Sequence, residues 1–318
     1  MDLPAQVSAG YRALHESAAL LDLSARGKIR VTGEDRARLL HAMGTNDVQR
    51  LQPGNGCYMF FLNAQGRILS DANVFCFEDH FLLDTEPEIR GKLHEHLDRY
   101  IIADDVTLED QTDALATIAV EGPDAAQVLD KLDAPLPENA YDWAAWGTRA
   151  VARVDSTGAS GFFILLPSAE KHQLVAELLR AGAFEATQDD SHTVRIEHGR
   201  PRYGEEITER YLVQETGQMH AINFNKGCYL GQEIVERVRS RAQIHRVLKQ
   251  LEIDSSTAPN AGTKLQTGGA DAAEIASAAY SPALGKVAAL AYVRTQHAAP
   301  GTELLLDATP ARVLPVAA

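Results

Sequence analysis

The sequence predicts an α+β fold in which two copies of a split β-α-β unit precede a small antiparallel β-barrel. Two observations predict this fold. A pattern of strands and helices occurs twice before residue 180, and beyond residue 245 the chain shows only short strands and turns. With 318 residues, the chain is long enough for two or three domains with sizeable cores.

The repeat begins with two matching segments, residues 29–40 (IRVTGEDRARLL) and 118–129 (IAVEGPDAAQVL). Both read I-x-V-x-G-x-D, so a strand turns at glycine into a helix with an acidic residue in its first turn. Residues 81–97 and 163–179 also match, and each reads as a strand that leads into an amphipathic helix. Chance similarity is the alternative to duplication, because such junctions favour these residues in any α/β unit.

Two hairpin candidates lie between these matches, residues 57–77 and 149–167. Each has two apolar strands around a turn that contains glycine. A polar strand candidate follows each copy, at residues 106–110 and 184–188. Both copies therefore read β-α-β-β-α and then a strand, which we interpret as two diverged copies of one unit.

The last part of the chain consists of short strand candidates separated by turn residues. They are residues 247–253, 273–281, 286–294, 302–306 and 311–316. We therefore expect three domains: a first α/β lobe at 1–115, a second at 116–242 and a barrel at 243–318. The first two lobes are expected to be able to exchange segments.

The composition argues against several classes of partner. Lysine plus arginine number 30 against 44 aspartate plus glutamate, and a net charge of -14 disfavours general attraction to nucleic acid or an anionic membrane. Cys57 and Cys76 lie in alternating apolar runs, which favours a reducing compartment. Without an export signal, a long apolar run or a coiled-coil pattern, we expect a soluble, monomeric, cytoplasmic protein.

A cysteine with basic neighbours stands at the junction between the second lobe and the barrel. Cys228 lies near Lys226 and just before a helix start at Gln232, and both features favour a thiolate. The alternative is a cysteine that packs as a small apolar residue beside Tyr229. The arginines that follow predict either a solvated face or an anion site. The sequence contains no pair of cysteines at a metal-binding spacing, so it does not predict a metal site.

Asp71 is the other candidate, in the second strand of the first hairpin. The alternation of that strand makes it either a surface aspartate or a half-buried carboxylate. In a cleft it could accept hydrogen bonds from a ligand or act as a base. The chain contains no glycine-rich phosphate loop, GxSxG or HExxH motif, so nucleotide hydrolysis, α/β-hydrolase and zinc-protease chemistry have no support.

These residues carry a family likeness. Residues 226–233, KGCYLGQE, match the K-G-C-Y-x-G-Q-E signature of the YgfZ family of folate-binding proteins, which are relatives of the aminomethyltransferase (T-protein) of glycine cleavage. Further matches run in the family's order at residues 22–36, 45–54, 58–71, 120–125 and 195–207. The sequence therefore resembles this family over about two thirds of its length.

The resemblance implies a three-lobed, T-protein-like ring around an opening that accepts tetrahydrofolate or a one-carbon derivative. It implies that Cys228 is the residue most closely tied to activity, with Lys226 beside it, and that Asp71 works next to the folate. The further folate contacts that it implies are Tyr58, Arg195, Glu197, Tyr229, Gln232 and Glu233.

Proteins similar to this one support iron-sulfur cluster assembly or repair, including in an enzyme that thiolates transfer RNA. We therefore predict a folate-binding accessory protein with iron-sulfur clients as partners and Cys228 as a thiol at the folate cleft. The alternative is a tetrahydrofolate-dependent aminomethyl or one-carbon transferase. A third possibility is an interaction module whose arginines dock an acidic partner.

Three positions depart from the T-protein pattern. T-proteins usually have two adjacent acidic residues at positions 70 and 71, and the first of them is Ser70 in this chain. Phe163 replaces a glutamate that binds the pterin ring in those proteins. Val213 replaces a proline before a Gln-Glu pair. Loss of a bidentate carboxylate contact is expected to weaken folate binding, since each charge-assisted hydrogen bond contributes roughly 1.5–3 kcal/mol.

Overall fold

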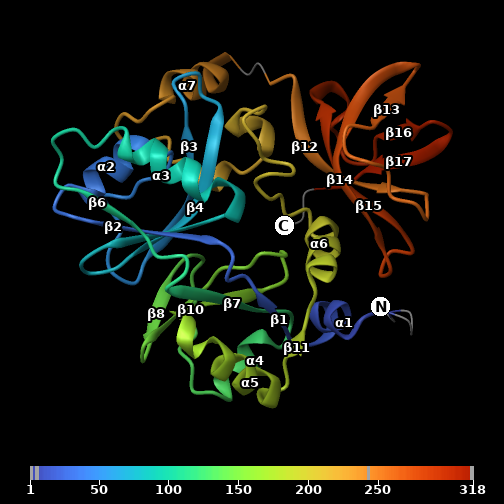
Figure 1. Ribbon diagram of the computed structural model, residues 1–318. Coiled ribbons are helices and arrows are strands. Elements are labelled where there is room, and N and C mark those ends of the chain that lie inside the picture. The colour runs from blue at the N-terminus through green and yellow to red at the C-terminus, as the bar shows by residue number, and fades with distance from the viewer. Residues whose placement is uncertain (1–2, 4–6, 242–243, 316–318) are drawn as a thin grey trace.

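The structure is a computed structural model that describes residues 3, 7–241 and 244–315. Its strands form a five-stranded sheet, a six-stranded sheet and a closed six-stranded barrel. Figure 1 shows them as two α/β lobes and an orange-to-red barrel beside them. This arrangement confirms the predicted α+β fold with a C-terminal antiparallel barrel.

The first lobe is built on a sheet in the order β3-β4-β5-β2-β6. Its elements are β2 (Gly27–Thr32), α2 (Arg36–Met43), β3 (Gly56–Leu62), β4 (Ile68–Cys76), β5 (Phe81–Thr85), η1 (Pro87–Ile89), α3 (Arg90–Asp98) and β6 (Thr107–Asp110). Leu40 of α2 and Leu97 of α3 are buried against Phe61 and Val74 of the sheet. The two helices therefore cover one face of this sheet.

The second lobe repeats the same elements. They are β7 (Leu115–Glu121), α4 (Ala125–Asp130), β8 (Trp143–Trp146), β9 (Arg149–Ala152), β10 (Gly161–Pro167), η2 (Ser168–Glu170), α5 (Lys171–Ala181) and β11 (Phe184–Glu185). The order β11-β1-β7-β10-β9-β8 equals that of the first sheet, except that β1 (Ala19–Asp22) is inserted between β7 and β11. Two copies of one unit should have the same strand order, so the shared order of the two sheets agrees with the predicted duplication.

Glycine makes the strand-to-helix turn possible in both lobes. Gly33 follows β2 with a φ of 100°, and Gly122 follows β7 with a φ of 119°, a backbone region that L side chains rarely adopt. A β-carbon on Gly122 would also lie 2.6 Å from the carbonyl oxygen of Ser17. The glycine shared by the two sequence matches therefore has the same structural role in each copy.

The two lobes exchange segments, so the predicted boundary at residue 115 does not separate them. Helix α1 (Ala9–Glu16) and strand β1 lie in the second lobe, and Figure 1 shows blue β1 within the green sheet. Conversely, Ile222 and Val235 belong to a buried cluster with Phe60 and Ile68 of the first lobe. The boundary predicted at residues 242 and 243 lies outside the described residues.

The segment that crosses back to the first lobe contains α6 (Gln188–Glu197), η3 (Val213–Thr216), η4 (Met219–Ala221) and α7 (Gln232–Arg241). Ile196 of α6 packs in one cluster with Leu290 and Tyr292 of the barrel. Helix α6 therefore connects the second lobe to the barrel.

The barrel closes because its first and last strands pair, with Leu251 opposite Val313. Its elements are β12 (Arg246–Ile253), β13 (Lys264–Thr267), β14 (Ala270–Ser281), β15 (Lys286–Arg294), η5 (Thr295–His297), β16 (Glu303–Leu306) and β17 (Thr309–Val313). The sequence did not predict β13, whose four residues are mostly polar. Within the described residues, no helix is both long and apolar enough to cross a membrane.

The two α/β sheets share a core between the lobes. Leu21 and Phe163 of the second sheet pack in one buried cluster with Phe75 and Leu82 of the first. Such apolar contact between sheets holds the lobes against each other. Each of the cavities described below takes lining residues from this shared core.

Candidate functional site

A cavity of about 650 Å³ lies between the two lobes and the segment that follows the second lobe. Its polar and aromatic lining includes Arg26, Tyr58, Asp71, Asn73, Glu86, Tyr141, Asp155, Ser156, Phe163, Arg195, Arg200, Arg202 and His220. A cavity of this volume with a few converging polar groups has the properties of a small-molecule site. We therefore take it as the candidate site.

Strand alternation directs Asp71 into this cavity. Asp71 and Asn73 of β4 line the cavity, whereas Val74 and Cys76 of the same strand belong to the core of the first lobe and do not line the cavity. Successive side chains of a strand point to opposite faces, so the buried apolar set fixes which face Asp71 occupies. Of the two possibilities that the sequence left open, a half-buried carboxylate therefore describes Asp71 better than a surface aspartate does.

The Asp71 carboxyl is buried, with only 6% of the residue exposed. Its Oδ2 accepts a hydrogen bond of 2.6 Å from the hydroxyl of Tyr58. Burial, together with the negative charge of Glu86, raises the pKa of Asp71 to about 7. The group therefore exchanges its proton near neutral pH, as a general acid or base requires.

Three aromatic rings form a wall beside this carboxyl. The ring of Tyr58 lies 5.4 Å from that of His220 and 6.5 Å from that of Tyr141, both in stacked orientation. The Tyr141 hydroxyl is 3.2 Å from Nε2 of His220, and burial lowers the pKa of His220. Tyr141 has a φ of 67°, which is rare for a tyrosine and concentrates at functional sites.

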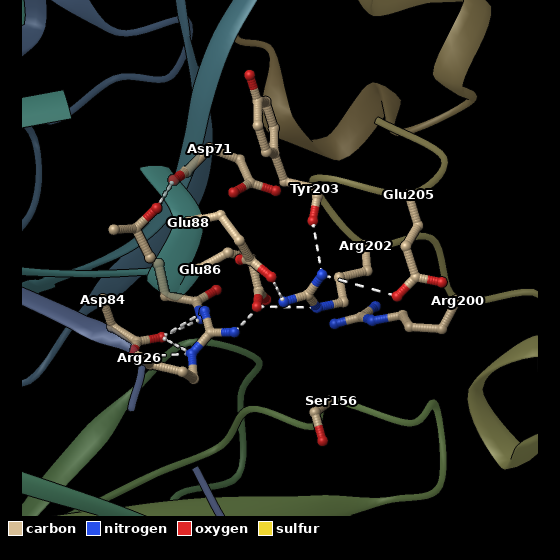
Figure 2. Close-up of polar contacts among 12 residues, drawn as sticks. Arg26, Asp71, Asp84, Glu86, Glu88, Ser156, Arg200, Arg202, Tyr203 and Glu205 are labelled. Atoms are coloured by element: carbon tan, nitrogen blue, oxygen red, sulfur yellow. Dashed lines mark hydrogen bonds and ion pairs between the residues drawn. The ribbon is translucent and has the colours of Figure 1, made fainter. Parts of the chain in front are cut away.

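A chain of ion pairs forms another wall (Figure 2). Arg26 donates to both carboxylate oxygens of the buried Asp84, with Nε 3.0 Å from each, and also pairs with Glu86. Arg202 pairs with Glu86 at 3.0 Å and with Glu88 at 2.6 Å. These pairs join the first lobe to the segment after α6 and leave the cavity wall with little unpaired charge.

Arg200 differs from these arginines because it points toward the space between Arg202 and Ser156 in Figure 2. Its Nη2 donates to the main-chain oxygen of Asp155 at 3.2 Å, and its Nε lies 3.7 Å from the carboxylate of that residue. About a third of the Arg200 side chain, 32%, is exposed. It is therefore placed to donate to an anionic group of a ligand.

Glu121 holds the loop that carries Ser156. This carboxylate is fully buried and accepts hydrogen bonds of 2.7 Å from the amide and hydroxyl of Ser156 and of 3.0 Å from the amide of Thr157. Burial raises the pKa of Glu121 to about 7. The sequence did not single out this residue, because its function depends on a loop that is distant in the chain.

The two predicted folate contacts of α6 have different surroundings. Arg195 lines the cavity, but its guanidinium is paired with Glu205 at 2.5 Å and Glu206 at 2.9 Å. Glu197 does not line the cavity and instead contacts α1, where it accepts from Tyr11 at 2.5 Å and pairs with His15 at 2.8 Å. Residues two apart on a helix face different directions, so α6 brings Arg195 to the cavity but not Glu197.

Lys226 anchors its segment to the end of α2. Its ammonium donates to the carbonyl oxygens of His41, Gly44 and Asn46 at 2.6, 2.6 and 2.7 Å. These three bonds use all three donors of the ammonium group, and a cation is favourable near a helix C-terminus. Lys226 is therefore engaged with the main chain, whereas the sequence led us to expect that it favours a thiolate at Cys228.

The rest of the octapeptide also lies away from the cavity. Cys228 is exposed, Tyr229 is buried in the core of the first lobe, and α7 begins at Gln232 as predicted. The cavity lining includes neither these three residues nor Glu233. The structure therefore does not bring this segment to the cavity, because Lys226 holds it against the end of α2.

Fold and site together define a class: a three-lobed protein with a polar cavity between two duplicated α/β lobes. The chain matches the GCVT N-terminal domain over residues 3–226 and the glycine cleavage T-protein C-terminal barrel domain over residues 246–317. It therefore belongs to the glycine cleavage T-protein family, whose aminomethyltransferases use tetrahydrofolate as one-carbon carrier.

Relatives of known sequence and structure agree with this assignment. The chain is 32% identical to an aminomethyltransferase of Streptomyces avermitilis, over 92% of this chain and 82% of that protein. It is 30% identical to an aminomethyltransferase of Rubrobacter xylanophilus, over 99% of this chain and 87% of that protein. The crystal structure of the glycine cleavage system aminomethyltransferase T from Bartonella henselae has the same fold, with a TM-score of 0.87 at 21% identity over 96% and 87%.

Proposed function

We propose that the protein binds tetrahydrofolate in the cavity between its lobes and transfers a one-carbon unit with it. The observation that carries this proposal is Asp71, a buried carboxyl with a pKa of about 7 in a cavity of a T-protein fold. This was the alternative function from the sequence. Membership of the aminomethyltransferase family supports it better than the iron-sulfur role, for which the relatives give no support.

The cavity has features that suit a folate. Its volume of about 650 Å³ is in the range of small-molecule sites, and the rings of Tyr58, Tyr141 and His220 offer a wall for a planar ring system. Arg200 can donate to the carboxylates of a folate tail. Phe163 is buried at the wall, so an apolar ring stands where the family pattern has a glutamate.

Asp71 supplies the proton transfer that this chemistry needs. A folate amine loses a proton when its nitrogen forms a bond to the one-carbon unit, and the Asp71 carboxylate can accept that proton. Tyr58 stabilises the carboxylate by donating its hydroxyl hydrogen. The donor that fits the family is an aminomethyl compound, whose carbon already has the oxidation level of methylene-tetrahydrofolate. As the two folate nitrogens bond to this carbon, its amino group leaves as ammonia and its other substituent leaves with a proton.

The test is formation of methylene-tetrahydrofolate from an aminomethyl donor. The wild-type protein should form it, Asp71→Asn should lose this activity, and the barrel variant Glu303→Gln should retain it. Calorimetry with tetrahydrofolate tests binding separately. Saturable binding without turnover of any such donor would contradict the transferase part, and absence of saturable heat at millimolar ligand would contradict the site itself.

A second candidate is the iron-sulfur accessory role, assigned to the YgfZ branch of the family. The observation that favours it is Cys228, which is exposed in the octapeptide while Cys57 and Cys76 are buried. An exposed thiol is available to a client protein or a cluster. In a deletion strain, Cys228→Ala should fail to restore iron-sulfur enzyme activity, and full restoration would exclude a role for the thiol.

A further inference from the structure

A second cavity, of about 480 Å³, lies between the same two lobes. None of its lining residues lines the first cavity. The polar and aromatic lining residues are Arg30, Phe77, His80, Gln111, Trp143, Thr148 and Arg149. The second cavity is therefore a separate space with its own chemistry.

The duplication relates the two cavities. Strands β4 and β9 occupy equivalent places in the two sheet orders, as do β5 and β10. The first cavity takes Asn73 from β4 and Phe163 from β10, whereas the second takes Arg149 from β9 and Leu82 from β5. Each cavity thus combines the β4-type strand of one lobe with the β5-type strand of the other, so the second is the counterpart of the first.

The register of the strands supports the same relation. Tyr58 of β3 pairs with Asn73 of β4, and Trp146 of β8 pairs with Arg149 of β9. The guanidinium of Arg149 lies 4.8 Å from the ring centroid of Trp146. An aromatic residue on the outer strand therefore accompanies a polar cavity residue on the next strand in both lobes.

Aromatic rings stack along one wall of the second cavity. The Phe77 ring lies 4.4 Å from the His80 ring at an interplanar angle of 8°, and 4.0 Å from the Trp143 ring at 29°. His80 and Trp143, the two end members of this stack, both line the cavity. A planar ring in the cavity can therefore extend the stack.

The polar groups of the second cavity are donors held in place by acids outside the lining. Arg149 pairs with Glu170 at 3.1 Å and Glu177 at 2.9 Å, which occupy its Nε and Nη1. Its Nη2 has no partner among the residues that the structure describes. Arg30 is held in the same way by Asp79 at 2.7 Å and Glu109 at 3.3 Å.

The described lining contains no aspartate or glutamate. Its ionisable side chains are Arg30, Arg149 and His80. Guanidinium groups fixed by acidic partners are preorganised to bind a carboxylate with little loss of side-chain freedom. We propose that the second cavity binds a small molecule that carries a carboxylate on an aromatic ring. The ring stacks on Trp143 or His80, and the carboxylate accepts from Nη2 of Arg149, the donor that Glu170 and Glu177 leave unoccupied.

The tryptophans make this site observable by itself. The chain has 2 tryptophans, Trp143 and Trp146, and both belong to the strand β8 at the second cavity, while the first cavity has none in its lining. A titration of the whole protein with 2-aminobenzoate should therefore quench tryptophan fluorescence in a saturable way. The neutral 2-aminobenzamide, with the same ring, should bind at least roughly tenfold more weakly, because it lacks the charge that pairs with arginine.

Three variants separate the two cavities. Ala145→Phe fills the second cavity from an exposed position, and Arg149→Met removes its main donor, so each should weaken the quenching at least roughly tenfold. Asp71→Asn in the first cavity should leave it unchanged. Absence of saturable quenching, equal affinity for the amide, or loss of quenching in Asp71→Asn with retention in Ala145→Phe would each overturn the proposal.

Discussion

The hydroxyl of Tyr58 and the carboxylate of Asp71 are joined by a hydrogen bond of 2.6 Å inside the cavity between the lobes. Burial raises the pKa of both groups, that of Asp71 to about 7 and that of Tyr58 well above its usual value. At neutral pH the tyrosine is therefore always the donor, and the proton that titrates belongs to the aspartate. This assigns the acid-base function of the site to one group.

The one-carbon transfer activity should rise with pH through about 7. The carboxylate form of Asp71 is the base, and its pKa of about 7 places the inflection there. Rates measured between pH 5 and 9 test this. Asp71→Asn should lower the rate by about 10²–10⁴-fold and abolish the inflection. A wild-type profile without an inflection between pH 6 and 8 would remove Asp71 from the proton transfer.

Asp71→Asn should also stabilise the fold above pH 7. The folded-state pKa of Asp71 is raised from 3.8 to about 7, so the folded protein binds this proton more tightly than the unfolded chain does. The free energy of unfolding therefore falls as pH rises from about 4 to 7 and then stays level. Asparagine carries no charge to bury, and the gain at pH 8 should reach about 2–4 kcal/mol.

Urea unfolding at pH 4 and pH 8 measures this difference. The wild type and Asp71→Asn should differ little near pH 4, where the aspartate is protonated in the folded protein and about half protonated in the unfolded chain, and they should diverge by pH 8. Equal stability at both pH values would mean that the cavity hydrates the carboxylate. Gain of stability with loss of activity is the expected behaviour of a residue kept for function.

The sequence predicted local structure well because local patterns depend on nearby residues. The glycine turns after β2 and β7, the hairpin that carries Asp71 and the barrel strands other than β13 follow from periodicity and turn residues. The sequence could not place β1, since any apolar strand fits several sheets and only long-range packing selects the second lobe. Strand β8 was missed as well, because its four residues are too short for a pattern.

The candidate site was predictable only in part. Asp71 and Tyr58 lie thirteen positions apart on a hairpin, so their meeting follows from register alone. Tyr141, His220 and Glu121 come from other parts of the chain and carry no local signal. The sequence could not show that the octapeptide lies against α2, because adjacency in sequence does not show where a side chain points, and Lys226 points to α2.

Lys226→Met should destabilise the protein by about 3 kcal/mol, since it removes three charge-assisted hydrogen bonds and leaves main-chain oxygens near the end of α2 unpaired. Lys131→Met is the matched control, because its exposed ammonium donates to a single carbonyl, that of Ala181. The control should change stability by less than about 1 kcal/mol. Urea midpoints measure both, and similar effects in the two variants would contradict the anchoring role.

Cys228 should react with an alkylating reagent much faster than the other two cysteines of the native protein. It is exposed, whereas Cys57 and Cys76 are buried, and burial raises the pKa of Cys57 to about 12. Mass spectrometry of peptides after brief iodoacetamide treatment measures all three rates in one sample. Denaturant should bring the three rates close together, which shows that the fold sets the difference. Reaction of Cys57 at the rate of Cys228 in the native protein would contradict the burial on which the assignment of an available thiol depends.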